Sequence, residues 1–176
     1  MRSIPVWDVF VRVTHWTVAT LVIADLSLLD GEAKAHHWAG YVVLGLVALR
    51  LVWGLIGPRF ARFSAFPPSL QAARAHLAGV LRGRHELYLS HNPLGALMVY
   101  NLWAAIILAG VSGHLMTTDA FFGVDWIEEV HEAVANWLIL SVVLHVAGVL
   151  FEMRASNVNL IRAMITGEKQ IPGPGE

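Results

Sequence analysis

Apolar residues dominate four stretches of the chain, and each is long enough for a helix that crosses a bilayer. A helix of about 20 residues, rising about 1.5 Å per residue, spans the roughly 30 Å of hydrocarbon. The four stretches lie roughly at 9–29, 37–57, 94–116 and 133–153. The pattern predicts an all-α integral membrane protein, a four-helix transmembrane bundle that forms a single domain over 1–176.

A longer connection, 58–92, separates the second stretch from the third and ends on Asn92-Pro93, a signal for the start of a helix. Inside it, apolar residues recur at helical spacing, which predicts a short helix lying on the membrane surface. The apolar face of this helix is formed by Leu70, Ala73, Leu77 and Leu81. A solvated linker is the alternative for this segment.

The basic residues predict the orientation of the bundle, because Lys and Arg in short loops stay on the cytoplasmic side. Only Lys34 falls on the other side, where the remaining loops are acidic. The other eleven lie at the termini or around 58–92: Arg2, Arg12, Arg50, Arg59, Arg62, Arg74, Arg82, Arg84, Arg154, Arg162 and Lys169. We therefore expect both termini and the 58–92 loop to be cytoplasmic. The apolar run near the N-terminus has no small-residue cleavage site, which indicates a retained first helix.

The composition agrees with a membrane protein and restricts its chemistry. Hydrophobic residues make up 56% of the chain and charged residues 14%, and the mean hydropathy is +0.59. There is no cysteine, which excludes disulfides, thiolate metal sites, iron-sulfur clusters and covalent c-type haem attachment. Metal chemistry must therefore rest on the nine histidines, the methionines and the carboxylates.

Histidines occur at two depths of the expected bundle, although polar side chains in a span are costly and usually functional. His15 lies near the inner end of the first span and His145 about two-thirds of the way inward along the fourth, whereas His36, His37 and His131 lie at the outer level. The fourteen residues from His131 to His145 return the helix to nearly the same face, about 21 Å along the axis. Two stacked sites on one face are implied.

A haem bound by two imidazoles needs one ligand from each of two helices at the same depth, and these histidines supply two such pairs. A small residue lies about one turn from each histidine, leaving room for a flat macrocycle. The pairs of histidine and small residue are His15 and Ala19, His36 and Gly40, His131 and Ala135, and His145 and Gly148. The alternative is that the histidines only make interhelical hydrogen bonds.

The chain also resembles the four-helix dihaem b-type cytochromes that include bacterial cytochrome b561 and the cytochrome b subunit of nickel-iron hydrogenases. The similar segments are VWDVFVRVTHW, HHWAGYVVLGLVALRLVWG, HNPLGALMV, and HE followed fourteen residues later by LH. This resemblance implies two haem b groups in the bacterial inner membrane. It implies that His15 and His145 bind the inner haem and that His36 and His131 bind the outer one.

The resemblance also decides between His36 and His37, because the family's ligand stands four residues before a glycine, as His36 does before Gly40. His114 is more typical of an interfacial residue, and Met116 is not needed as a ligand once four histidines are paired. The remaining histidines belong to the basic inner loop: His76, His85 and His91. Arg12 and Arg50, near the inner span ends, are candidate partners for haem propionates, although positive-inside placement also explains them.

The leading functional hypothesis is transmembrane electron transfer between the quinone pool and a periplasmic redox partner such as a c-type cytochrome. Acidic residues around His131 would attract a basic soluble partner, and the resemblance also implies quinone as a reactant. Two alternatives stay open from the resemblance: a superoxide-oxidising quinone reductase and an anchor subunit of a periplasmic hydrogenase-like oxidoreductase. A haem-free anchor or metal transporter is a third. No feature indicates a nucleic-acid partner.

Overall fold

The computed structural model of the chain describes residues 2–28, 31, 33–84 and 86–171. Four long helices form the bundle, and they carry the apolar stretches of the sequence: α1 (Val9–Leu28), α2 (Lys34–Ile56), α4 (Pro93–Met116) and α5 (Asp125–Ser156). All four are long and apolar enough to cross a membrane. Few residues of their apolar windows are buried inside the protein, between 11% and 22%. The apolar side chains therefore face outward, as expected when lipid is the solvent.

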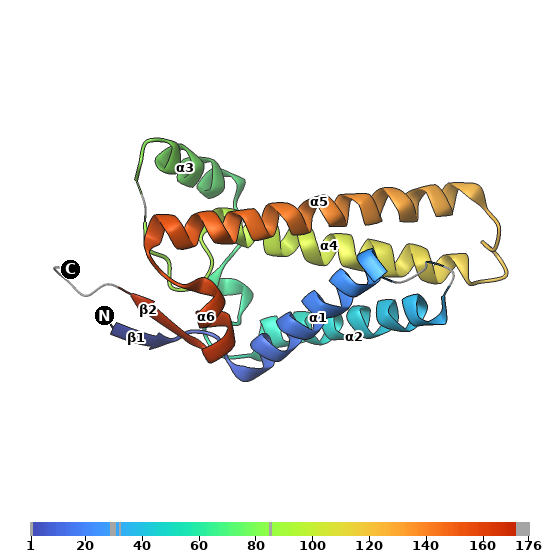
Figure 1. The fold of residues 1–176 in the computed structure, drawn as a ribbon, viewed down its shortest axis with the longest axis horizontal. Helices are drawn as coiled ribbons and strands as arrows, with labels where there is room; N and C mark the ends of the chain where they lie inside the picture. The colour runs from blue at the N-terminus through green and yellow to red at the C-terminus, as the bar shows by residue number, and fades with distance from the viewer. Residues whose placement is uncertain (1, 29–30, 32, 85, 172–176) are drawn as a thin grey trace.

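Both chain termini lie at one end of the bundle, which we call the inner end (Figure 1). The opposite end, formed by the start of α2, the end of α4 and the start of α5, is called the outer end. Two short strands, β1 (Arg2–Pro5) and β2 (Glu168–Ile171), pair antiparallel at the inner end. A short helix, α6 (Leu160–Thr166), precedes β2. The apolar pattern predicted neither the strands nor α6, because each is shorter than a periodic signal requires.

The connection 58–92 contains the expected short helix, α3 (Leu70–Leu81), and a 3₁₀ turn, η1 (Phe63–Ala65). Ser69 caps α3 by accepting a hydrogen bond from the Ala72 N–H. Ala73 is buried, whereas Leu70, Leu77 and Leu81 are exposed. The helix thus presents leucines away from the protein, as an interfacial helix would.

Helices α4 and α5 pack together along the bundle, joined by a polar contact within their apolar surfaces. The Asn101 amide donates to Ser141 Oγ at 2.8 Å and accepts from the Trp137 indole at 3.0 Å. At the inner end, a second side-chain amide, that of Asn92, donates a hydrogen bond to the Glu152 carboxylate at 3.0 Å. Interhelical hydrogen bonds of this kind stabilise helix pairs in lipid.

Helix α5 is longer than the expected span 133–153, which lies inside it. Its 32 residues correspond to about 48 Å, more than the hydrocarbon thickness. The additional residues at the outer end include Asp125 and Glu128, which favour the positive end of the helix dipole. The polar residues between 125 and 132 end the apolar stretch in the sequence, but the helix continues through them.

Candidate functional site

The inner pair of histidines meets between the first and last spans. His15 lies on the second turn of α1, and His145 lies in the inner half of α5, eleven residues before its last residue, Ser156. Their ring centroids are 6.4 Å apart with an interplanar angle of 55°. His15 Nδ1 is buried with no hydrogen-bond partner among the described residues. The structure therefore brings together the two rings that the sequence places at the inner level.

The outer pair meets between α2 and α5. The ring centroids of His36 and His131 are 6.1 Å apart, with an interplanar angle of 85°. His37 packs against His36 at 5.9 Å, and its side chain is exposed. Of the two neighbouring histidines, His36 is the one that faces His131.

Each ring of the outer pair is oriented by a hydrogen bond at Nδ1. His36 Nδ1 donates to the Asp25 carboxylate at 3.0 Å. His131 Nδ1 donates to the Ala109 carbonyl at 3.1 Å and lies 3.0 Å from Ser112 Oγ. Metal-binding histidines are held in this way, with one nitrogen bonded to the protein and the other left to the metal. In both rings Nε2 is thus available as a ligand.

The spacing of the two ring pairs fits one metal ion between each pair. A metal–imidazole bond is about 2 Å and the ring centre lies about 1 Å behind the nitrogen, so trans imidazoles have centroids about 6 Å apart. A side chain added at Gly40 or Gly148, near His36 and His145, would meet no atom within 4 Å. Both pairs therefore have the donors and adjacent open space that a bis-imidazole haem requires. Within the described residues no three His, Asp or Glu side chains gather to hold a bare ion.

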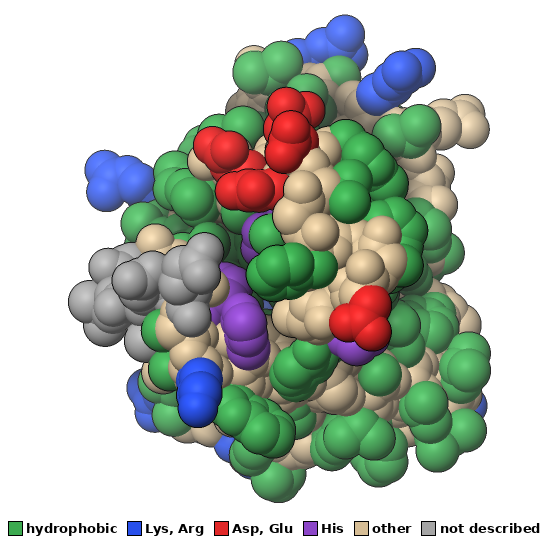
Figure 2. Space-filling model, turned by 90° about the vertical axis from the view of Figure 1, so that its right-hand side faces the viewer, with side chains coloured by type: hydrophobic (Ala, Val, Ile, Leu, Met, Phe, Trp, Pro, Cys, Tyr) green, Lys and Arg blue, Asp and Glu red, His purple; other side chains and the backbone are tan. Residues whose placement is uncertain are grey.

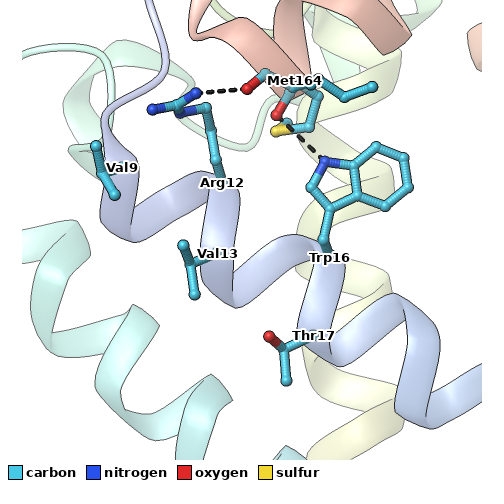
Figure 3. Close-up of a pocket in the computed structure, with 7 residues that line it drawn as sticks. Val9, Arg12, Val13, Trp16, Thr17 and Met164 are labelled. Carbon is cyan, nitrogen blue, oxygen red and sulfur yellow. Dashed lines mark hydrogen bonds between the residues drawn. The ribbon is translucent and has the colours of Figure 1, made fainter.

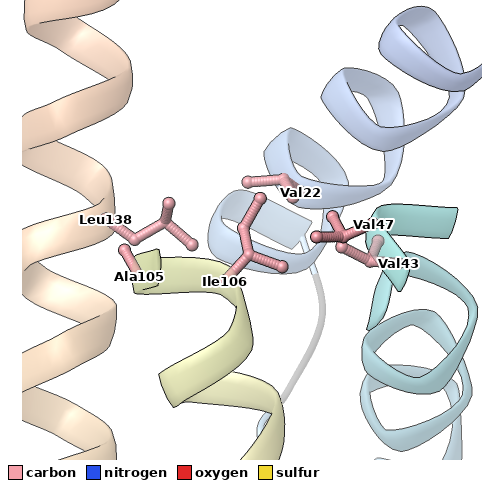
Figure 4. Close-up of a cluster of buried hydrophobic side chains, with 6 residues drawn as sticks. All are labelled: Val22, Val43, Val47, Ala105, Ile106 and Leu138. Atoms are coloured by element: carbon pink, nitrogen blue, oxygen red, sulfur yellow. The ribbon is translucent and has the colours of Figure 1, made fainter. Parts of the chain in front are cut away.

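A layer of packed apolar side chains, shown in Figure 4, lies along the helices between the levels of the two pairs. Leu138 lies seven residues from both His131 and His145, halfway along this part of α5. The layer consists of Val22, Val43, Val47, Ala105, Ile106 and Leu138. It lies between the levels of the two pairs, on the same part of α5 as the hydrogen bond between Ser141 and Asn101.

Acidic side chains are grouped at the outer end, beside a recess in which histidine side chains are visible (Figure 2). They are exposed on the first turns of α5, around the histidine of the outer pair: Asp125, Glu128, Glu129 and Glu132. Lys34 and His37 are exposed at the same end. This end consequently presents a mostly negative surface.

The two arginines at the inner level both have partners within the protein. Arg12 donates through Nη1 to the Ile165 carbonyl and lines a groove of about 550 Å³ between α1 and α6 (Figure 3). Arg50 is 7% exposed, donates to the Ala61 carbonyl at 2.9 Å and lies over the Trp103 ring. Each keeps one buried nitrogen without a partner among the described residues, Nε in Arg12 and Nη1 in Arg50. Their role as propionate partners stays a prediction.

The other histidines lie away from the two pairs, except His91. His114 is exposed and hydrogen-bonded to the Tyr41 hydroxyl at 3.0 Å, and His76 packs on Tyr88. His85 lies outside the described residues. His91, just before α4, packs between the rings of Trp7 and Phe66 at centroid distances of 5.0 and 4.8 Å. Burial, together with the nearby positive charges of Lys169 and Arg50, lowers the pKa of His91 to about 3.

Sequence reasoning missed Asp25, the carboxylate that holds His36. The signal was present, because Asp25 is an ionisable residue within an apolar span and such residues mark functional sites. It also missed Ser112 and the Ala109 carbonyl. A backbone carbonyl has no sequence signature, so this contact required the structure.

Comparison with known proteins gives a family for this arrangement. A family model described as prokaryotic cytochrome b561 matches residues 6–167. Searches of the curated proteins and of the solved structures gave no match. The matched range includes all four spans and both histidine pairs.

Proposed function

Because the chain belongs to the prokaryotic cytochrome b561 family, whose members carry electrons across membranes on b-type haem, we propose that it holds two such haems. We propose further that it passes electrons across the bacterial inner membrane, between a periplasmic redox partner and the quinone pool. The inner pair, His15 and His145, holds one haem, and the outer pair, His36 and His131, holds the other. The observation that carries the proposal is the presence of two facing imidazole pairs at two depths.

The ligand set restricts the chemistry to electron transfer. A haem bound by two imidazoles supplies a one-electron iron couple with no open coordination position. The protein's part is to orient the rings, which Asp25 and the Ala109 carbonyl do at the outer level. It also separates the two sites by about 20 Å along α5, with the apolar layer between them. Substrate binding at iron is not part of this function.

Charged groups near the two pairs support inward flow of electrons. The outer pair has the Asp25 carboxylate on a ligand ring and acidic residues at the surface, which favour the oxidised, more positive site. At the inner end, Arg50 and Lys169 are buried close to His91, next to the inner pair, and Asp8 and Glu152 balance them in part. Buried positive charge favours the reduced state. The outer site therefore has the lower reduction potential, and electrons move from the periplasmic partner towards quinone.

The negative outer surface supports a basic redox protein as the partner, because complementary charge raises the rate of encounter. A c-type cytochrome or a hydrogenase-like oxidoreductase fits this description. Superoxide, the substrate of the alternative function, is an anion that the same surface repels, although Lys34 and His37 offset this locally.

Proteoliposomes test the function directly. Wild-type protein is inserted with its outer end outside, the vesicles contain a water-soluble quinone analogue, and a reduced basic cytochrome c is added outside. We expect two external cytochromes to be oxidised for each trapped quinone that is reduced to quinol, with the two protons taken up inside the vesicle. The variant His145→Ala should abolish this coupling, whereas His76→Ala should leave it unchanged. Coupling only when superoxide replaces the cytochrome would favour the alternative, and no coupling with either donor would contradict the proposal.

A further inference from the structure

The C-terminal segment, residues 157–171, folds back onto the inner end of the bundle. Asn157 ends α5 with a left-handed backbone conformation, φ 55°, which turns the chain towards α1. Helix α6 then packs with Ala163 1% exposed, and β2 completes the segment by pairing with β1. Figure 1 shows this segment beside the base of α1 and far from the outer end.

The last carbonyls of α6 are bound by two α1 side chains that flank His15. Trp16 Nε1 donates to the Met164 carbonyl at 3.2 Å, and Arg12 Nη1 donates to that of Ile165 (Figure 3). These bonds satisfy acceptors that a helix end leaves free. They also hold the turn of α1 that carries His15. The Trp16 ring meets the His15 ring edge-on, with centroids 5.2 Å apart.

The junction between α6 and β2 is bonded to the start of the chain. The Gly167 carbonyl accepts from the backbone N–H groups of Val6 and Trp7 at 2.9 and 3.0 Å. Gly167 has φ +89°, and a Cβ there would lie 2.6 Å from the Trp7 carbonyl oxygen and 3.4 Å from the Arg12 guanidinium. Only glycine allows this close approach.

Lys169 on β2 connects the segment by hydrogen bonds to the loop that precedes α4. Its side chain is 6% exposed, and Nζ donates to the carbonyls of Tyr88, Leu89 and Ser90 at 2.6, 3.2 and 3.4 Å. These residues lead into His91 and α4. One short segment thus contacts the helix that carries an inner ligand and the loop that packs beside the inner site.

We propose that residues 157–171 form a clasp that sets the orientation of the His15 ring, with Trp16 and Arg12 as positioning residues and Lys169 as its second attachment. The inference rests on the proposed ligation by His15. The contacts of the clasp are at the inner end, so its loss alters the inner haem and spares the outer one. This selectivity distinguishes the clasp from an element that merely stabilises the whole fold.

The test uses the full-length protein loaded with haem and reads the two ferric low-spin EPR signals together with a redox titration. The EPR signal of a bis-imidazole haem depends on the orientation of its two rings. Trp16→Phe keeps the aromatic contact with His15 and removes the bond to Met164, and Lys169→Met removes the second attachment. Trp137→Phe is the matched control, because that indole also donates to a neighbouring helix but lies away from the clasp.

We expect Trp16→Phe and Lys169→Met each to shift the EPR signal of the inner haem alone, identified as the signal lost in His145→Ala, and the uncharged change Trp16→Phe to shift its potential as well. The control should shift neither. If the wild type holds both haems but the two variants shift both signals or neither, the clasp is overturned and the proposed function stands. If the wild type holds no haem, the proposed function fails and the clasp fails with it.

Discussion

The hydrogen bond between Asp25 and His36 is the residue-level feature that most clearly distinguishes the outer site from the inner one. A carboxylate on the far nitrogen of a ligand ring fixes its orientation and makes it more basic. His131 has a neutral carbonyl in the same position. Asp25 is therefore expected to control both the retention and the potential of the outer haem.

Replacing Asp25 by Asn tests this expectation with little change in shape. We expect the outer haem to bind about 10- to 100-fold more weakly, as is usual for lost ligand-supporting contacts, and its potential to rise. A redox titration and the haem content after washing measure both effects. Asp119→Asn, at the same end but without a described contact to a ligand, is the control. An unchanged outer potential in Asp25→Asn would show that the carboxylate does not act on the site.

His91 gives a prediction for pH at the same scale. Its pKa of about 3 in the folded protein is below the usual 6.5, so below about pH 6.5 the unfolded chain binds a proton that the folded protein refuses. The contribution of His91 to the free energy of unfolding is therefore fully retained above about pH 6.5 and is lost as the pH drops towards 3. His91→Gln should reduce this loss, measured as the melting temperature in detergent between pH 7.5 and 5. Parallel pH profiles for the variant and the wild type would refute the assignment.

The histidines could be paired from sequence, whereas their supporting contacts could not. Spacing along one helix and depth in the bundle place His15 and His145 at one level and His131 at the other, and the choice of His36 over His37 comes from the family resemblance. What holds the rings depends on how α4 packs against α5 and how α1 packs against α2. Ser112 and Ala109 look like ordinary helix residues in the sequence.

Among the elements, length decided what the sequence could predict. The four spans and α3 have enough residues for a helical period to show. β1, β2 and α6 have 4, 4 and 7 residues, and the pairing of the two strands joins positions more than 160 residues apart. Nothing local in the sequence indicates that the two ends of the chain meet.

Gly167 provides the test of this junction at the level of elements. Gly167→Ala forces an alanine into a left-handed conformation and against the Trp7 carbonyl, and we expect a loss of about 2–4 kcal/mol in stability. Gly83→Ala is the matched control, because it has φ +73° but no neighbour within 4 Å, and should cost about 1–2 kcal/mol. Thermal or denaturant unfolding in detergent gives both values. Equal losses would mean that the close approach at Gly167 has no energetic weight.

For the whole molecule, we expect the asymmetry of charge between the two ends to determine which partner it meets. The outer end is acidic and the inner end carries buried positive charge, so the proposed partner at the outer end is a basic protein. Replacing Glu128, Glu129 and Glu132 by Gln should slow electron exchange with a basic cytochrome c about tenfold at low salt. Stopped-flow mixing measures this rate, and exchange with a quinone analogue serves as the control. A cytochrome rate that is independent of both salt and these replacements would exclude steering by this surface.

We propose that two histidine pairs hold two haems, one towards each end of the spans. The most direct measurement is the haem content of the purified protein with its reduced-minus-oxidised spectrum, in the wild type and in single His→Ala variants. We predict two b-type haems per chain, with His15→Ala and His145→Ala losing the same haem and His36→Ala and His131→Ala losing the other. His37→Ala should keep both. A colourless wild type, or loss of the outer haem in His37→Ala with its retention in His36→Ala, would contradict this claim.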